Sequence, residues 1–265
     1  MYQLAKESDV AELLSYFEQD LKNCLYSYID LKKYGVEHKD LQIYFQREKD
    51  GLTSVATKYY NGLQLYCLEQ DFPVEETVSL IQELAPSIIS STPDVIRLLS
   101  PHFCPGYELE KGFVTSISKI LYTDLSFHVK PADFEDLEEI ANLICMDEGL
   151  GGHYTVADLT MQLSSRMKEN FGRNYIIRQE GNIVCHAATY AEVDNLAVIS
   201  GVITHPVHRG KGFALTLVSK LCEDLLSEGK QPHLFYYTES AGYLYNKIGF
   251  RSPSGWAKLV KHETV

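Results

Sequence analysis

Apolar and polar residues in the second half of the chain follow the order strand, loop, helix, strand. An apolar run at Leu196–Thr204 predicts a strand, and a polar loop with two glycines follows at His205–Gly212. In Phe213–Ser227 apolar residues recur every three or four positions, which predicts an amphipathic helix that Gly229 is suited to end. Pro232–Tyr237 predicts the next strand. Such a unit after an antiparallel hairpin predicts an α+β fold, a mixed and mostly antiparallel sheet flanked by helices.

A β-hairpin pattern occurs twice along the chain. Residues 47–59 and residues 178–190 each show a strand, a polar turn with glycine, and a second strand. Each hairpin follows a short strand and an amphipathic helix. The helix begins near Ser8 in the first half and near Ala132 in the second. A repeat of about half the chain predicts a duplicated domain, although two hairpins can also resemble each other by chance.

The repeat predicts two domains of nearly equal length. We expect the boundary within Ser116–Asp124, with one domain at residues 1–120 and the other at residues 121–265. The chain has 265 residues, which is enough for two domains of ordinary size. Its 45% hydrophobic and 23% charged residues are typical of globular domains with sizeable cores.

The net charge of −12 narrows the range of partners. An acidic chain repels nucleic-acid backbones and anionic lipid surfaces, so neither partner is expected. Against that background the basic residues of the loop, His208, Arg209 and Lys211, indicate a site for a small anionic ligand. Neither a signal peptide nor an apolar run of roughly 20 residues is evident, which predicts a cytoplasmic protein.

The six cysteines are spread along the chain without a Cys-x-x-Cys pair. Their spacing, without clustered histidines, predicts neither a zinc site nor any other metal site. A disulfide framework is not expected in a chain of this size, so we interpret the cysteines as reduced and mostly buried thiols.

The loop before the long helix has the properties of a phosphate-binding site. The N-terminus of a helix exposes unpaired N–H groups and carries roughly half a positive charge. Gly210 and Gly212 lack a Cβ, so the backbone can turn sharply and an anion can approach closely. Arg209 and Lys211 add positive charge to the loop. Ala214 is a third small residue after the two glycines. An uninterrupted run of donors suits a pyrophosphate better than a single carboxylate.

Two segments resemble motifs of the GNAT acetyltransferase superfamily. Val202–Pro206 followed by Arg209–Ala214 resembles the family's coenzyme A motif, and Leu244–Phe250 resembles its later Leu-Tyr-x-Lys-x-Gly-Phe segment. The resemblance covers about residues 126–260. The form Thr-His-Pro-x-x-Arg-Gly-Lys-Gly is most similar to the glycine N-acyltransferase-like branch.

The resemblance implies roles for particular residues. In the family, the end of the strand before the loop pairs with the pantetheine arm of coenzyme A, and the loop amides hold the pyrophosphate. The implied cofactor-binding residues are Val202, Ile203, Thr204, Arg209, Gly210, Lys211, Gly212, Phe213 and Ala214. Tyr245 stands where the family's tyrosine protonates the departing thiolate. A phenol suits that role because its pKa is near that of a thiol.

The general base is left open by the sequence. Many members of the family use a glutamate on the strand before the loop, but Leu196–Thr204 contains no carboxylate. The neighbouring candidates are Glu192, Asp194, His186, His205 and Glu239. A water-mediated route, or direct attack by a neutral amine, is also compatible with the sequence.

The corresponding stretch in the first half, Glu69–Glu76, is acidic and has no glycine. If the first half is a degenerate GNAT-like copy, we expect it to have lost coenzyme A binding and to shape the acceptor pocket or pack against the catalytic half. The resulting prediction is an acyltransferase that moves an acyl group, acetyl by preference, from acyl-coenzyme A to the amine of a small molecule or amino acid. Alternatives are a non-catalytic protein that binds or senses coenzyme A, and an acetyltransferase acting on proteins or peptides. A homodimer is compatible with the sequence.

Overall fold

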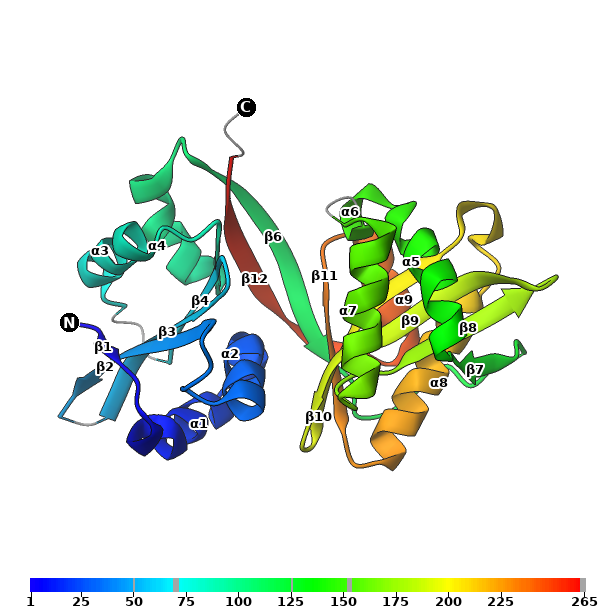
Figure 1. The fold of residues 1–265 in the computed structure, drawn as a ribbon, viewed down its shortest axis with the longest axis horizontal. Helices are drawn as coiled ribbons and strands as arrows, with labels where there is room; N and C mark the ends of the chain where they lie inside the picture. The colour runs from blue at the N-terminus through cyan, green and yellow to red at the C-terminus, as the bar shows by residue number, and fades with distance from the viewer. Residues whose placement is uncertain (50, 69–71, 125, 152–153, 263–265) are drawn as a thin grey trace. The chain divides into compact units, whose positions relative to one another are not determined.

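Two units that repeat one order of helices and strands make up the chain (Figure 1). This computed structural model describes residues 1–49, 51–68, 72–124, 126–151 and 154–262. The first unit consists of Met1–Val114 and Ser254–Val265, and the second of Thr115–Pro253. Along the chain, each half runs through a short strand, helices, three strands, a helix, a strand, a helix and a last strand, but the last strand of the second run joins the first unit. The predicted α+β fold with two copies is confirmed.

The second unit contains the segments singled out in the sequence. Its strands are β7 (Val129–Pro131), β8 (Asn174–Gln179), β9 (Asn182–Val193), β10 (Leu196–Thr204) and β11 (Gln231–Tyr236). Its helices are α5 (Leu137–Cys145), α6 (Glu148–Gly151), α7 (Val156–Lys168), α8 (Phe213–Ser227) and α9 (Glu239–Ile248). The bounds predicted for β10 and α8 are confirmed.

The sheet of the second unit is mostly antiparallel. The strands β7, β8, β9 and β10 lie side by side in that order, each antiparallel to the next, and β11 joins β10 in parallel. The β10–β11 pairing covers only Leu196–Ile199, so the second half of β10 has no registered partner in β11. The sheet therefore opens along the part of β10 that leads into the loop.

The helices of the second unit bury separate apolar clusters. Leu217, Leu221 and Leu225 of α8 are fully buried beside Ala197 and Ile199 of β10. A second cluster joins α5 and α7 to the sheet through residues such as Ile140, Leu163 and Ile176. Burial of each such side chain contributes about 1.5–3 kcal/mol, so packing on the sheet fixes the position of α8 and of the loop before it.

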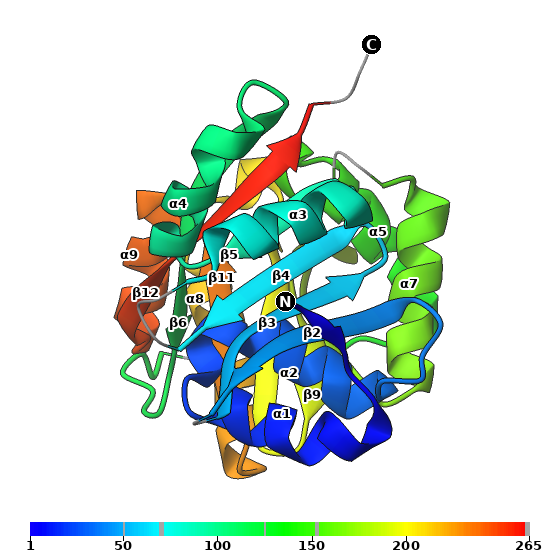
Figure 2. The ribbon, with the colours of Figure 1, turned by 90° about the vertical axis from the view of Figure 1, so that its left-hand side faces the viewer.

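The first unit uses the same arrangement. Its strands are β1 (Gln3–Leu4), β2 (Leu41–Glu48), β3 (Gly51–Tyr59), β4 (Gly62–Cys67), β5 (Ile88–Ser91), β12 (Arg251–Lys261) and β6 (Tyr107–Ser116), in that spatial order. Its helices are α1 (Val10–Glu18), α2 (Leu21–Tyr34), α3 (Val74–Leu84) and α4 (Pro93–Phe103). Figure 2 shows α1 and α2 on one face of β2, β3 and β4, with α3 on the other.

The last strand of the chain completes the sheet of the first unit. In β12, Ala257–Val260 pairs antiparallel with Ile88–Ser91 of β5. Ala257 and Leu259 are buried in the cluster formed by α3, α4 and the sheet. The predicted domains, 1–120 and 121–265, differ from these units at both ends of the second one. Local sequence patterns do not specify which sheet a terminal strand will join.

None of the helices among the described residues combines the length and apolar character needed to cross a bilayer.

We predict that Leu259→Ala destabilises the first unit. Leu259 is fully buried, so its truncation removes apolar contacts and leaves a cavity. The free energy of unfolding should fall by about 2–5 kcal/mol. Hydrogen exchange should show faster opening of β4 and β5. Leu109→Ala in β6 is the control, because the Leu109 side chain is 45% exposed. Equal exchange in the two variants would contradict the placement of β12.

Candidate active site

A cavity of about 680 Å³ lies in the second unit between the end of β10, the start of α8 and α9. Its lining includes every predicted cofactor-binding residue except one: Val202, Ile203, Thr204, Arg209, Gly210, Gly212, Phe213 and Ala214. Lys211 is the exception, since it is exposed and lies outside the lining residues. The predicted catalytic residue, Tyr245, also lines the cavity. The structure therefore brings together two motifs that are 30 residues or more apart along the chain.

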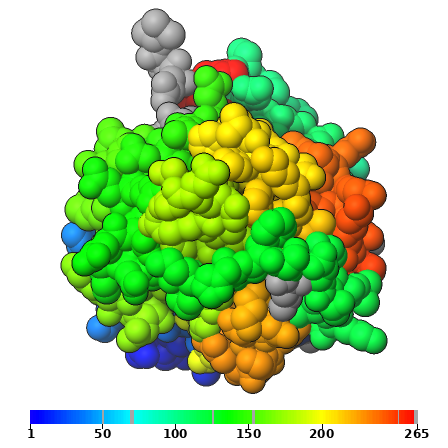
Figure 3. Space-filling model, turned by 90° about the vertical axis from the view of Figure 1, so that its right-hand side faces the viewer, coloured from blue at the N-terminus to red at the C-terminus, as the bar shows by residue number. Residues whose placement is uncertain are grey.

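The loop between β10 and α8 presents a row of free backbone donors. After a short 3-10 turn at Pro206–His208, Gly210 and Gly212 adopt φ angles of 78° and 89°, in the left-handed region that favours glycine. Within the described chain, the N–H groups of residues 210–215 have no hydrogen-bond acceptor. The loop is exposed, and its segment is drawn in yellow at the surface in Figure 3. Such an array at the start of a 15-residue helix suits an anion.

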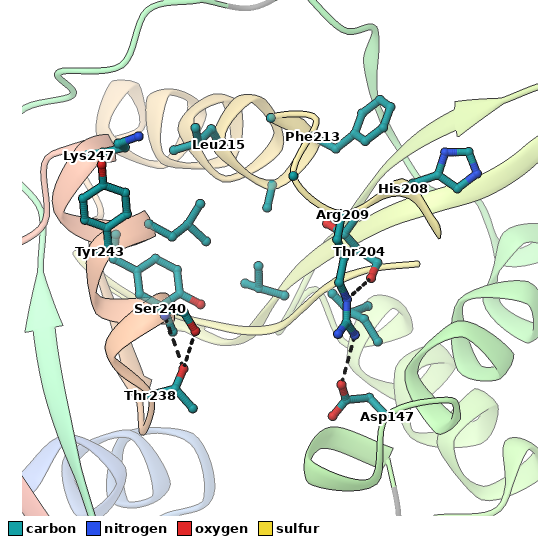
Figure 4. A pocket seen from close by; sticks show the side chains of 18 of the residues that line it. Asp147, Thr204, His208, Arg209, Phe213, Leu215, Thr238, Ser240, Tyr243 and Lys247 are labelled. Carbon is teal, nitrogen blue, oxygen red and sulfur yellow. Dashed lines mark hydrogen bonds and ion pairs between the residues drawn. The ribbon is translucent and has the colours of Figure 1, made fainter. Parts of the chain in front are cut away.

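The side chains that line the cavity carry more positive than negative charge. Arg209 and Lys247 are the cationic lining residues, and Asp147 is the one carboxylate among the described lining residues. Figure 4 shows Arg209 and His208 on one side of the cavity and Tyr243 and Lys247 of α9 on the other. A negatively charged ligand is therefore favoured here, although the protein as a whole is acidic.

Asp147 was not predicted from the sequence. Its Oδ2 accepts from the Arg209 guanidinium at 3.3 Å, while Oδ1 accepts from the amides of Gly149 and Leu150 at 3.1 and 3.3 Å. Arg209 also donates to the carbonyl oxygen of Thr204 at 3.1 Å (Figure 4). The Arg209–Asp147 pair is half-exposed, so it contributes about 0–1 kcal/mol and can open when an anion arrives. No local pattern marks an aspartate between two short helices.

Tyr245 lines the cavity, but most of its side chain is buried. Its side chain is 7% exposed, and its ring lies 5.9 Å from that of Tyr236 and 5.7 Å from that of Phe250. Burial raises the pKa of Tyr245 well above its usual value, and the nearby Cys222 thiol adds to the shift. The sequence predicts a phenol whose pKa is near that of a thiol. The buried phenol is instead a weaker acid that stays protonated at physiological pH.

None of the five residues considered as general base is among those that line the cavity. Glu192 is held by Arg173 at 2.7 Å and by Lys230. Burial alone would raise the pKa of Glu192, but hydrogen bonds from Arg173, Lys230 and Thr189 outweigh burial and leave it below its usual value. Asp194 lies in the turn at the opposite end of β10, with a φ of 43°. The carboxylate of Glu192 therefore serves a structural role.

The three other candidates also lie outside the cavity lining. Glu239 is exposed at the first position of α9. His205 precedes the 3-10 turn, and its ring lies 5.8 Å from that of His208. His186 is fully buried, and burial lowers its pKa to about 4, so it is neutral at physiological pH. The general base that the sequence left open is therefore not assigned to any of these side chains.

The first unit differs at the position equivalent to the loop. There β4 leads to α3, which begins after Pro73 and carries Glu75 and Glu76 in its first turn. Residues 69–71 of the predicted acidic stretch lie outside the described residues. Two carboxylates in the first turn of a helix repel an anion at its N-terminus, whereas the first turn of α8 has no acidic residue.

Comparisons with known proteins agree with this geometry. Residues 160–258 match the family model described as GNAT acetyltransferase, whereas no curated protein matches the chain. A GCN5-related N-acetyltransferase from Sphaerobacter thermophilus is 17% identical, with 98% of this chain and 95% of that chain covered and a TM-score of 0.65. An acetyltransferase of the GNAT family from Colwellia psychrerythraea is 12% identical, with 99% and 100% covered and a TM-score of 0.62.

A tandem GNAT protein from the clavulanic acid biosynthesis pathway is 9% identical, with 100% of this chain and 99% of that chain covered and a TM-score of 0.57. At such identities the three structures establish the fold, and the family match supplies the transferase assignment. The resemblance to the glycine N-acyltransferase-like branch stays a prediction. Residues 160–258 therefore match the GNAT acetyltransferase family, which supports a transferase, and the chain as a whole has a fold similar to that of a tandem GNAT protein.

Proposed function

We propose that the protein transfers an acyl group, preferentially acetyl, from acyl-coenzyme A to the amine of a small molecule or amino acid. The single observation that carries this proposal is the row of free N–H groups at residues 210–215, beside a cavity that also contains Tyr245. A pyrophosphate offers enough acceptor oxygens to satisfy such a row, and the dipole of α8 favours its charge. A cytoplasmic location remains part of the proposal.

The residues of the cavity fit coenzyme A along its length. The backbone of Val202–Thr204, which has no registered partner in β11, offers hydrogen-bonding groups to the amide-containing pantetheine arm. The loop amides receive the pyrophosphate. Lys247, whose Nζ lies 4.5 Å from the centre of the Tyr243 ring, places a cation on the other side of the cavity.

The reaction needs few side chains if the acceptor arrives as a neutral amine. The amine nitrogen attacks the thioester carbonyl carbon, the C–N bond forms, and the C–S bond breaks. The nitrogen loses one proton and the sulfur gains one, so the products are an amide and a free thiol. Tyr245, a phenol that is protonated at physiological pH and lines the cavity, is suited to donate a hydrogen bond to the sulfur as negative charge develops on it.

The overall activity can be tested by following thiol release from acetyl-coenzyme A with a panel of amines and amino acids. Turnover with at least one small amine would support the proposal. Tight binding of coenzyme A without turnover of any small amine would instead favour a binding or sensing protein. Turnover only with basic peptides would move the acceptor class to proteins.

We predict that Gly210→Glu weakens coenzyme A binding at least tenfold, because it adds a carboxylate to the loop and strains a backbone with a φ of 78°. Calorimetry with coenzyme A measures the effect. Gly229→Glu is a matched control, since Gly229 has the same φ, also has open space around it, and follows the far end of α8, about 22 Å away. Equal affinities in both variants would show that the loop does not hold the pyrophosphate.

We predict that Tyr245→Phe lowers kcat by about 100-fold with little change in the Kd for acetyl-coenzyme A, because only the proton donor is removed. Steady-state kinetics and calorimetry separate the two quantities. Tyr243→Phe is the control, as Tyr243 also lines the cavity and lies on α9 but is 66% exposed. Parallel losses of binding and turnover in Tyr245→Phe would assign the residue to packing.

A further inference from the structure

His186 occupies a fully buried position on β9, next to the part of β10 that lines the cavity. Its Nδ1 lies 2.8 Å from the carbonyl oxygen of Gly201, and its Nε2 lies 2.9 Å from the side-chain oxygen of Asn174. Both ring nitrogens are therefore engaged. The contact with Gly201 is made by a side chain to the backbone of a strand, where a neighbouring strand would normally supply the partner.

The contact falls at an irregularity of β10. The regular pairing with β9 is interrupted between Ser200 and Ile203, and Gly201 adopts a φ of 63°. A Cβ on Gly201 would lie 3.2 Å from Cε1 and 3.4 Å from Nδ1 of His186. The imidazole thus occupies the space that a side chain at position 201 would need, and the bulge and the histidine depend on each other.

The chemistry of the two partners fixes the state of the ring. A carbonyl oxygen only accepts hydrogen bonds, so Nδ1 must carry the proton that is donated to Gly201. In a neutral imidazole Nε2 is then an acceptor, and a half-turn of the Asn174 amide presents its NH₂ group to it. The ring is held as a neutral donor to Gly201, and it is not among the residues that line the cavity.

The hydrogen bond also orients the next N–H group. The carbonyl of Gly201 and the N–H of Val202 belong to one planar trans peptide, so they point in opposite directions. With the carbonyl held by His186, the Val202 N–H points away from the ring. Val202, Ile203 and Thr204 line the cavity directly after this peptide.

We propose that His186 is a positioning residue: by holding the Gly201 carbonyl it fixes the bulge in β10, and so sets the backbone of Val202–Thr204 for the acyl-coenzyme A thioester. This inference rests on the proposed function for its ligand. The hydrogen bond itself can be tested without that ligand. Loss of the donor leaves a partly buried carbonyl without its His186 partner, and the backbone that follows it loses its fixed orientation.

The test compares His186→Leu, which removes the donor, with His186→Asn, whose amide can place an N–H near the former Nδ1. We expect His186→Leu to raise the Kd for acetyl-coenzyme A and its KM about tenfold, the scale of one buried hydrogen bond, and His186→Asn to restore most of the affinity. Ile183→Ala is the control for instability, since Ile183 is buried on the same strand but is not a partner of Gly201. It should lower Tm without changing the Kd.

Two measurements on the free protein decide the positioning role independently of activity. Long-range ¹H–¹⁵N spectra of wild type should show the His186 proton on Nδ1, and hydrogen exchange at Val202 and Ile203 should accelerate in His186→Leu but not in His186→Asn. A proton on Nε2, or unchanged exchange in His186→Leu, would overturn the proposal. If wild type neither binds nor turns over acyl-coenzyme A while these backbone results hold, the proposed function fails and the positioning of β10 by His186 stands.

Discussion

The candidate site depends on the point along β10 at which its pairing with β11 ends. This strand has nine residues, but β11 pairs with it only over Leu196–Ile199. Backbone donors and acceptors that have no partner must be satisfied by water, by a side chain or by a ligand. At Gly201 the partner is His186. From Val202 onward the backbone faces a cavity, and at the start of α8 a row of free amides continues the same surface. The site is therefore built mainly from main chain, and packing against the sheet holds it in place.

The two units share an order of elements but differ at the position of the anion loop. Both have the order strand, helices, three strands, helix, strand and helix. In the second unit, glycines at positive φ precede a helix without acidic residues in its first turn. In the first unit, the equivalent helix starts after Pro73 and carries Glu75 and Glu76 in that turn. The apolar contacts that form each sheet tolerate this difference, whereas the electrostatics of the helix N-terminus do not.

The geometry constrains the donor more closely than the acceptor. Free amides, the arginine of the loop and Lys247 all suit an elongated anion. The candidate bases near β10 serve other purposes: Glu192 stabilises a charged network, and His186 holds the bulge. Asp147 is already bonded to Arg209 and two amides. A neutral amine, attacking without a dedicated carboxylate, is the simplest route consistent with this arrangement.

The sequence by itself determined the elements and the anion loop, because both follow from local rules: apolar periodicity for β10 and α8, and glycine before a helix for the turn. The tandem fold was also predictable, since the same pattern recurs after half the chain. Only the tertiary structure decided which distant groups meet. It placed β12 in the first unit's sheet, brought Asp147 to Arg209, and placed the His186 ring against the carbonyl oxygen of Gly201. It also buried Tyr245 and so raised its pKa. These outcomes depend on long-range packing and desolvation, which no spacing along the chain encodes.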